Sequence, residues 1–98
     1  MWRKLSFRMV YLSNIEHVFT VPTRGCVIVP LAVTETVAIG DMIQLRSEGA
    51  CLDSRIVGIE MITRQPGLPC KVGFLLSEEI TKSQISPGAE IWIGRIVA

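Results

Sequence analysis

The fold is decided by residues 18–29, which read Val18-Phe19-Thr20-Val21, Pro22-Thr23-Arg24-Gly25 and Cys26-Val27-Ile28-Val29. The two outer tetrapeptides are apolar and rich in β-branched residues, a composition that favours strands. Between them, Pro22 restricts its own φ and Gly25 tolerates a positive φ, so a tight turn is predicted. Pro30 cannot donate a ladder hydrogen bond, so the second strand must end, bulge or lie at an edge there. The stretch therefore predicts a β-hairpin.

Further short strands are predicted on both sides of this hairpin. Before it, Leu5, Phe7, Met9 and Tyr11 alternate with polar residues, the period expected of a strand over residues 4–12 that buries one face. After it, the expected strands cover residues 31–39, 42–46, 51–62, 72–76 and 90–97. The run at 72–76 is apolar throughout, which is typical of a strand buried on both faces.

Helical character is confined to residues 77–85. Ser77 is a candidate N-cap there, and we expect one helical turn at most. Seven or eight short strands without a substantial helix predict an all-β fold. A chain of 98 residues supports one hydrophobic core, so we expect a single domain over residues 1–98. At this length a closed barrel protects strand edges better than an open sheet does.

The order of these segments resembles domain 2 of the translational GTPases, the β-barrel of elongation factor Tu and its relatives. The matching pieces run in family order between residues 16 and 93 and read Val18-Phe19-Thr20-Val21, Arg24-Gly25-Cys26-Val27-Ile28, Ile39-Gly40-Asp41-Met42-Ile43-Gln44-Leu45, Ile56-Val57-Gly58-Ile59-Glu60-Met61, Val72-Gly73-Phe74-Leu75-Leu76 and Ile85-Ser86-Pro87-Gly88-Ala89-Glu90-Ile91. The resemblance implies a closed six-stranded, Greek-key-type barrel of the translation-protein kind, extended by the strand at 4–12. It also implies that Gly25, Gly40, Gly73 and Gly88 are architectural, since a barrel turns or brings backbones together at such positions.

The chain departs from that family in ways that bear on function. It contains no Gly-x-x-x-x-Gly-Lys-Ser/Thr phosphate loop, so we expect neither GTPase activity nor a bound nucleotide or other cofactor. Val29-Pro30-Leu31 stands where the family usually has Thr-Gly-Arg, and Ile62-Thr63 stands where Phe-Arg follows the matching Glu60-Met61. In elongation factor Tu this region helps to hold the aminoacyl end of transfer RNA.

Composition and charge exclude several classes of protein. The formal charge of +1 produces no overall attraction to nucleic acid or anionic membrane. Arg8 interrupts the apolar character of the N-terminus, which argues against a signal peptide, and the uncharged run at 25–34 is too short for a membrane span. Three widely spaced cysteines match neither a disulfide framework nor a metal site. We therefore expect a cytoplasmic protein without a metal ion.

Nucleophilic catalysis has little support in the residue pattern. Cys26 lies in an apolar strand and is interpreted as a core residue. Cys51 and Cys70 border turns, and a small thiol-dependent enzyme acting through either of them is the weakest of the functional hypotheses. Asp53 and the pair Glu78-Glu79 are interpreted as solvated carboxylates. We expect the protein not to be an enzyme.

Binding is the function that the sequence favours, as an assembly module resembling domain 2 of elongation factors. Arg46, Arg55, Glu60 and Arg64 are the candidate partner-binding residues, and the alternative is an RNA-binding accessory protein of the ribosome or of RNA modification. Aromatic residues are expected mainly in the core. The apolar residues near the termini exceed what a small monomer can bury, so we expect the terminal strands to pair and present a patch to a protein partner or a second copy. That predicted patch comprises Trp2, Trp92, Ile93, Ile96 and Val97.

Overall fold

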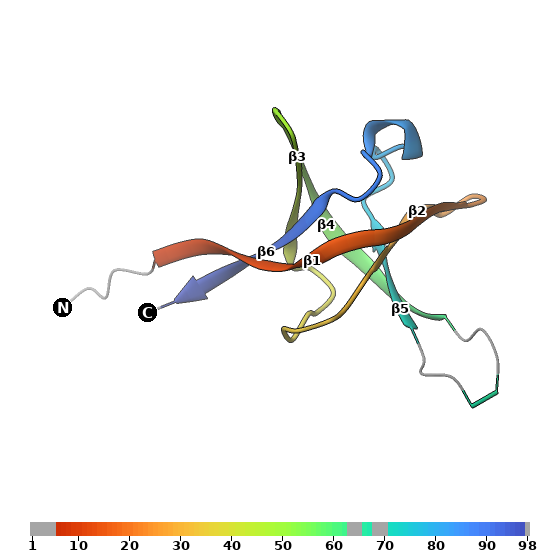
Figure 1. Cartoon of the computed structure of the whole chain (residues 1–98), viewed down its shortest axis with the longest axis horizontal. Coiled ribbons are helices and arrows are strands. Elements are labelled where there is room, and N and C mark those ends of the chain that lie inside the picture. The colour runs from red at the N-terminus through yellow and green to blue at the C-terminus, as the bar shows by residue number, and fades with distance from the viewer. Residues whose placement is uncertain (1–5, 63–65, 68–70, 98) are drawn as a thin grey trace.

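The predicted hairpin forms and joins the first two strands of a barrel (Figure 1). Val21 accepts a hydrogen bond from the amide of Arg24, and the turn places Thr23 and Gly25 at positive φ. The computed structural model describes residues 6–62, 66–67 and 71–97. Its elements are β1 (Ser6–Val21), β2 (Gly25–Pro30), β3 (Met42–Ser47), β4 (Ala50–Ile62), β5 (Lys71–Leu76), the 3-10 turn η1 (Lys82–Gln84) and β6 (Glu90–Val97).

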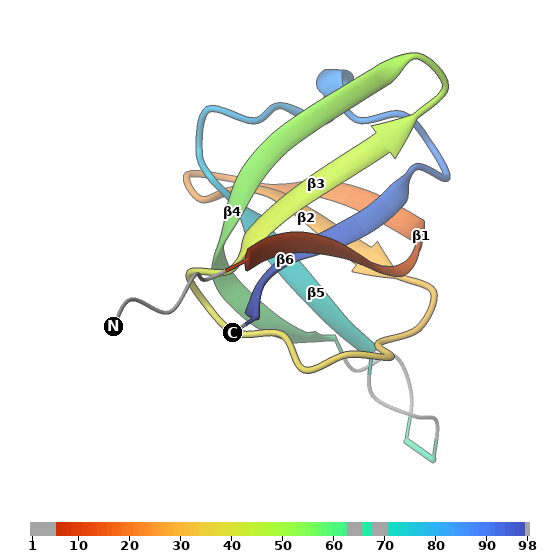
Figure 2. The same cartoon turned by 90° about the vertical axis from the view of Figure 1, so that its left-hand side faces the viewer.

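All neighbouring strands are antiparallel, and they close in the order β1-β2-β5-β4-β3-β6. Consecutive hairpins connect β3, β4 and β5, and β6 returns to lie beside β3, which is a Greek-key arrangement (Figure 2). The predicted all-β, closed six-stranded barrel is thus confirmed. Its interior is filled by apolar side chains, of which Phe74 is the largest that is fully buried.

The predicted number of strands was too high for two reasons. The strand expected at 4–12 is not an extra element, because its residues 6–12 continue into the hairpin strand as one 16-residue β1, while residues 4 and 5 lie outside the described residues. Irregularities after Tyr11 and after Ile15 increase the local twist of this strand, which lets it exchange β6 for β2 as its partner. The segment predicted as a strand at 31–39 is irregular, because it crosses one end of the barrel from β2 to β3 and forms no ladder with any described strand.

The prediction that the second strand is interrupted at Pro30 was confirmed, whereas the predicted N-cap of the helical turn was wrong. β2 ends at Pro30, as the missing amide hydrogen requires. The single helical turn exists, but its N-cap is Thr81 and not Ser77. Thr81 donates its backbone amide to Oε1 of Gln84, whereas the Ser77 hydroxyl accepts a hydrogen bond from Ser54. The Ser77 side chain, predicted as the N-cap, is therefore engaged in a tertiary hydrogen bond instead.

The strand over 72–76 is buried as predicted, and the absence of a side chain at Gly73 allows it to pack closely against its neighbours. A methyl group on Gly73 would lie 2.6 Å from Cγ1 of Val27 and 3.0 Å from Cδ1 of Ile62. Those distances are below normal contact, so only glycine fits between β2 and β4 here. Cys26, on the opposite face of β2 from Val27, belongs to the buried core cluster inside the barrel, which confirms its interpretation as a core residue.

Candidate functional site

The first half of β1 and the last residues of β6 form a two-stranded ribbon beyond the closed part of the barrel (Figure 1). β2 accompanies β1 only from Ile15 onward, and β3 accompanies β6 only as far as Ile93. The ribbon therefore consists of residues 6–11 paired with residues 92–97, of which only residues 94–97 extend past β3. This pairing of the two terminal segments confirms that part of the sequence prediction.

One face of the ribbon, continued by β3, carries exposed apolar and aromatic side chains. Phe7 lies opposite Ile96 in the register, and their side chains are 53% and 69% exposed. Tyr11 packs edge-on against Trp92 with ring centroids 5.5 Å apart. We define the outer ribbon face as Phe7, Tyr11, Met42, Trp92 and Ile96. Water covers much of this face, because period-two alternation directs these side chains away from the barrel interior.

A hollow of about 380 Å³ opens on this face at the start of β3. Gly94 has no side chain, and the ring of Phe7 leans over it, so a methyl group there would lie 2.6 Å from Cζ of Phe7. Met42 and Ile96 also line the hollow. Its polar rim is supplied by Arg55, which donates from Nη1 to the carbonyl oxygen of Gly40 at 3.4 Å.

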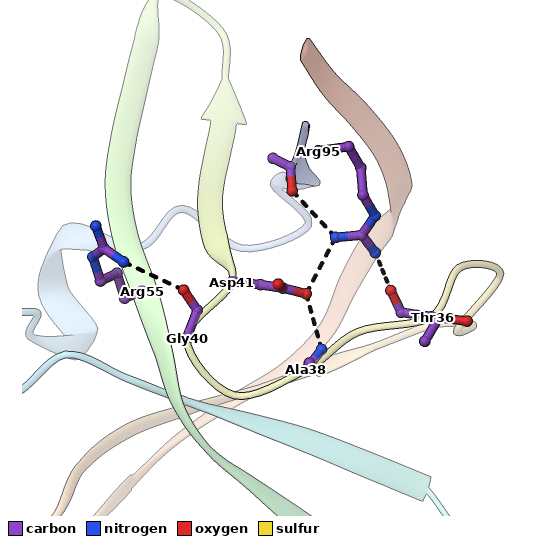
Figure 3. Close-up of polar contacts among 7 residues, drawn as sticks. Thr36, Ala38, Gly40, Asp41, Arg55 and Arg95 are labelled. Carbon is purple, nitrogen blue, oxygen red and sulfur yellow. Dashed lines mark hydrogen bonds and ion pairs between the residues drawn. The ribbon is translucent and has the colours of Figure 1, made fainter. Parts of the chain in front are cut away.

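The other side of the rim is an ion pair that ties the ribbon to the 31–41 segment (Figure 3). Nη1 of Arg95 lies 3.1 Å from Oδ2 of Asp41, and the Arg95 guanidinium also donates to the carbonyl oxygen of Thr36. Asp41 Oδ2 accepts a further hydrogen bond from the amide of Ala38 at 2.9 Å. The Asp41 carboxylate is therefore engaged, while the Arg55 guanidinium retains donors that face solvent.

The predicted site residues do not form one face. Arg46 lies 4.1 Å from the ring centroid of Trp92 and donates from Nε to Oε1 of Gln44 at 2.5 Å. In the β3–β4 register, Met42 faces Arg55, so four residues of strand, about 13 Å, separate Arg46 from the hollow. Arg55 lines the hollow.

The other two predicted site residues lie elsewhere. The Glu60 carboxylate pairs with Arg24 at 2.6 Å, near the other end of β4. Arg64 lies outside the described residues. Of the predicted residues, Arg55 alone is placed on the hollow by the structure.

Of the predicted terminal patch, Ile93 was wrongly placed and Ile96 was correctly expected to be exposed. Ile93 is buried in the core, because residues of β6 alternate between interior and surface, while Ile96 is exposed and Trp92 is half-buried. Trp2 and the Val97 side chain lie outside what the structure describes. The expectation that aromatic residues mainly pack in the core was wrong for Phe7, Tyr11 and Phe19. The alternation of Phe7, Met9 and Tyr11 correctly predicted a strand with one apolar face, but not that this face lies outside the barrel.

A larger hollow of about 650 Å³ lies between the middle of β1 and the residues around η1. Its apolar walls include Ile15 and Ile85, both of which are buried members of the core. Lys71 is paired with Glu16 beside it. The walls of this hollow already contribute to folding, so the apolar side chains of the outer ribbon face are the better candidates for binding.

Residues 6–62, 66–67 and 71–97 contain few other groups that could bind a metal ion or act as a nucleophile. No group of three or more His, Cys, Asp or Glu side chains in these ranges could hold a metal ion. Among the residues that the structure describes, no helix has the length and apolar character needed to cross a bilayer. Cys51 is exposed on β4, and Cys70 lies outside the described residues.

No family model, no curated protein and no solved structure matches the chain.

Proposed function

We propose that this protein is a non-catalytic binding module of the cytoplasm, similar to domain 2 of translation elongation factors but acting without a GTPase domain, and that it binds another protein on the outer ribbon face. The observation that carries the proposal is the exposed cross-strand pair of Phe7 and Ile96 beside the hollow.

Solvation of this pair is energetically unfavourable, because both side chains are large and apolar. Two-stranded ribbons have little stability by themselves in water. Large apolar side chains contribute favourable free energy only when water is removed from them. Burial of apolar area contributes roughly 25 cal/mol per Å², so a partner that covers both side chains and the hollow gains affinity from them. Aromatic side chains and arginine are enriched at the centres of protein interfaces. Phe7, Tyr11 and Arg55 match that composition.

The test compares two exposed side chains of similar accessibility. Ile96→Ser removes an apolar group from the outer ribbon face, and Met61→Ser removes one that is 67% exposed on β4, outside that face. Tagged wild-type and variant proteins are used for affinity capture from lysate of the source organism, with and without ribonuclease. We expect a ribonuclease-resistant protein partner that Ile96→Ser loses and Met61→Ser retains. Equal capture by both variants would refute the proposal.

A second candidate, the RNA-binding accessory protein, has one observation in its favour. Arg46 lies over Trp92, and Tyr11 contacts the same indole, a grouping of cation and aromatic rings that can stack on unpaired bases. This candidate predicts that captured RNA depends on Arg46 and that binding weakens steeply with salt. Ribonuclease-sensitive capture lost in Arg46→Ala would favour it over protein binding.

A further inference from the structure

We propose that the free edge of β1, Ser6–Tyr11, accepts an extended strand of a partner protein in which apolar residues alternate with acidic ones. This inference rests on the proposed function, because it names the kind of partner that the outer ribbon face would bind. Three features of the ribbon carry it: an unpaired strand edge, an unbalanced positive charge and an apolar opposite face.

The edge is open over the whole projecting half of β1. Within the described residues, the backbone of residues 6–11 pairs with β6 on one side and with no strand on the other. The irregular segment after β2 reaches β1 only further along, where Leu31 donates its amide to Asn14 and Thr34 donates its hydroxyl to the carbonyl of Leu12. Unpaired N–H and C=O groups in a row are a template for strand addition.

The charge next to this edge favours an acidic partner. Arg8 lies directly opposite Arg95 in the β1–β6 register, and like charges in such cross-strand positions repel. Asp41 neutralises Arg95, but no ion pair joins Arg8 to any described residue. An acidic residue on the added strand would lie beside Arg8 and remove this imbalance.

The same register specifies the other side of the partner strand. Phe7, Met9 and Tyr11 alternate with Arg8, so they lie on the opposite face of the ribbon. A strand added beside them matches both faces when its residues alternate between acidic and apolar. A second copy of this edge matches poorly, because antiparallel pairing would bring two Arg8 side chains together on one face.

The test uses designed peptides as probes and fluorescence anisotropy as the readout. A labelled, capped peptide of alternating valine and glutamate is titrated with the full chain at low ionic strength, and a valine–lysine peptide is the charge control. We expect the glutamate peptide to bind about fivefold more tightly, the upper end of what one favourable cross-strand charge pair contributes. No preference between the peptides would overturn the proposal.

A charge reversal on the protein tests the contact with Arg8. Arg8→Glu is expected to reverse the preference in favour of the lysine peptide, while Lys82→Glu, on the exposed turn η1, leaves the preference unchanged. The same reversal in both variants would show a general charge effect and overturn the proposal. Circular dichroism of both variants confirms that the barrel is folded.

Backbone pairing is tested with N-methylated glutamate peptides. Antiparallel strands use alternate amides on each edge, so methylation of one alternate set should abolish binding while methylation of the other set is tolerated. Binding by both methylated peptides would exclude strand addition. Light scattering that shows a dimer of the free protein, lost in Met9→Ser, would instead assign the edge to a second copy.

These outcomes separate the inference from the proposed function. If capture from lysate depends on Ile96 but the glutamate peptide does not bind, a partner uses the outer ribbon face in another way and only the strand proposal fails. If capture is insensitive to Ile96 while the peptide binds in the predicted manner, the edge binds strands but the proposed docking face is wrong.

Discussion

Replacement of Gly73 by alanine should destabilise the barrel, although alanine is the smallest possible addition. The new methyl group would lie 2.6 Å from Cγ1 of Val27 and 3.0 Å from Cδ1 of Ile62. Val27 is fully buried and β-branched, so its χ1 is restricted and its neighbours leave it little room to move. Overpacking of this kind costs about 1–3 kcal/mol. Loss of freedom in the unfolded chain offsets roughly 0.4–1 kcal/mol of that cost, which leaves a net destabilisation of about 0–2.6 kcal/mol with its centre between about 1 and 2 kcal/mol.

Gly94→Ala is the matched control, because its methyl group meets an atom at the same nominal distance. The obstructing atom is Cζ of Phe7, at 2.6 Å, with Cβ of Met42 at 3.2 Å. Phe7 is half exposed and can rotate into solvent, so we expect the free energy of unfolding to stay within about 0.5 kcal/mol of wild type. The two new methyl groups meet atoms at the same distance, but only Gly73→Ala should lower the free energy of unfolding appreciably, because Phe7 can move away and Val27 has little room to do so.

Urea unfolding followed by tryptophan fluorescence measures both effects. A loss of about 1–2 kcal/mol lowers the urea midpoint by roughly 1 M and the Tm by roughly 4–16 °C in a domain of this size. In the double variant Gly73→Ala/Val27→Ala, the methyl groups removed from Val27 make room for the new one. We therefore expect its loss of unfolding free energy to be about 1 kcal/mol smaller than the sum of the losses in the two single variants. The steric reasoning is refuted if Gly73→Ala unfolds like wild type, if Gly94→Ala is equally destabilised, or if the double variant is simply additive.

Three further outcomes follow from the packing. Arg46→Ala should cost about 0.5–1 kcal/mol through the lost contact with the Trp92 ring and should change the tryptophan emission, which unfolding curves and spectra will show. Iodoacetamide should label Cys51 in the folded protein and Cys26 only after denaturation, as peptide mapping will reveal. Phe74→Ala, which empties the largest fully buried position, should cost about 3–5 kcal/mol and leave little far-UV signal of the native barrel at 37 °C.

The candidate site was only partly predictable. Arg55 was singled out from the sequence and lines the hollow, but Arg46 and Glu60 found partners of their own in Trp92 and Arg24. Charged residues on separate strands converge only where the register places them, and the register is a property of strand pairing. Arg95 was overlooked for the same reason, since its position opposite Arg8 depends on how β6 aligns with β1.

The sequence by itself determined the strand periods, the hairpin turn at 22–25 and the end of β2, because alternation, proline and glycine act over a few residues. It also showed that residues 4–12 have one apolar face. Only the tertiary structure decided that this segment is continuous with β1, that residues 31–39 cross the barrel without pairing, and that Phe7 and Ile96 lie in water. The physical reason is that alternation specifies which side chains share a face, whereas the closure of the barrel decides whether that face is covered.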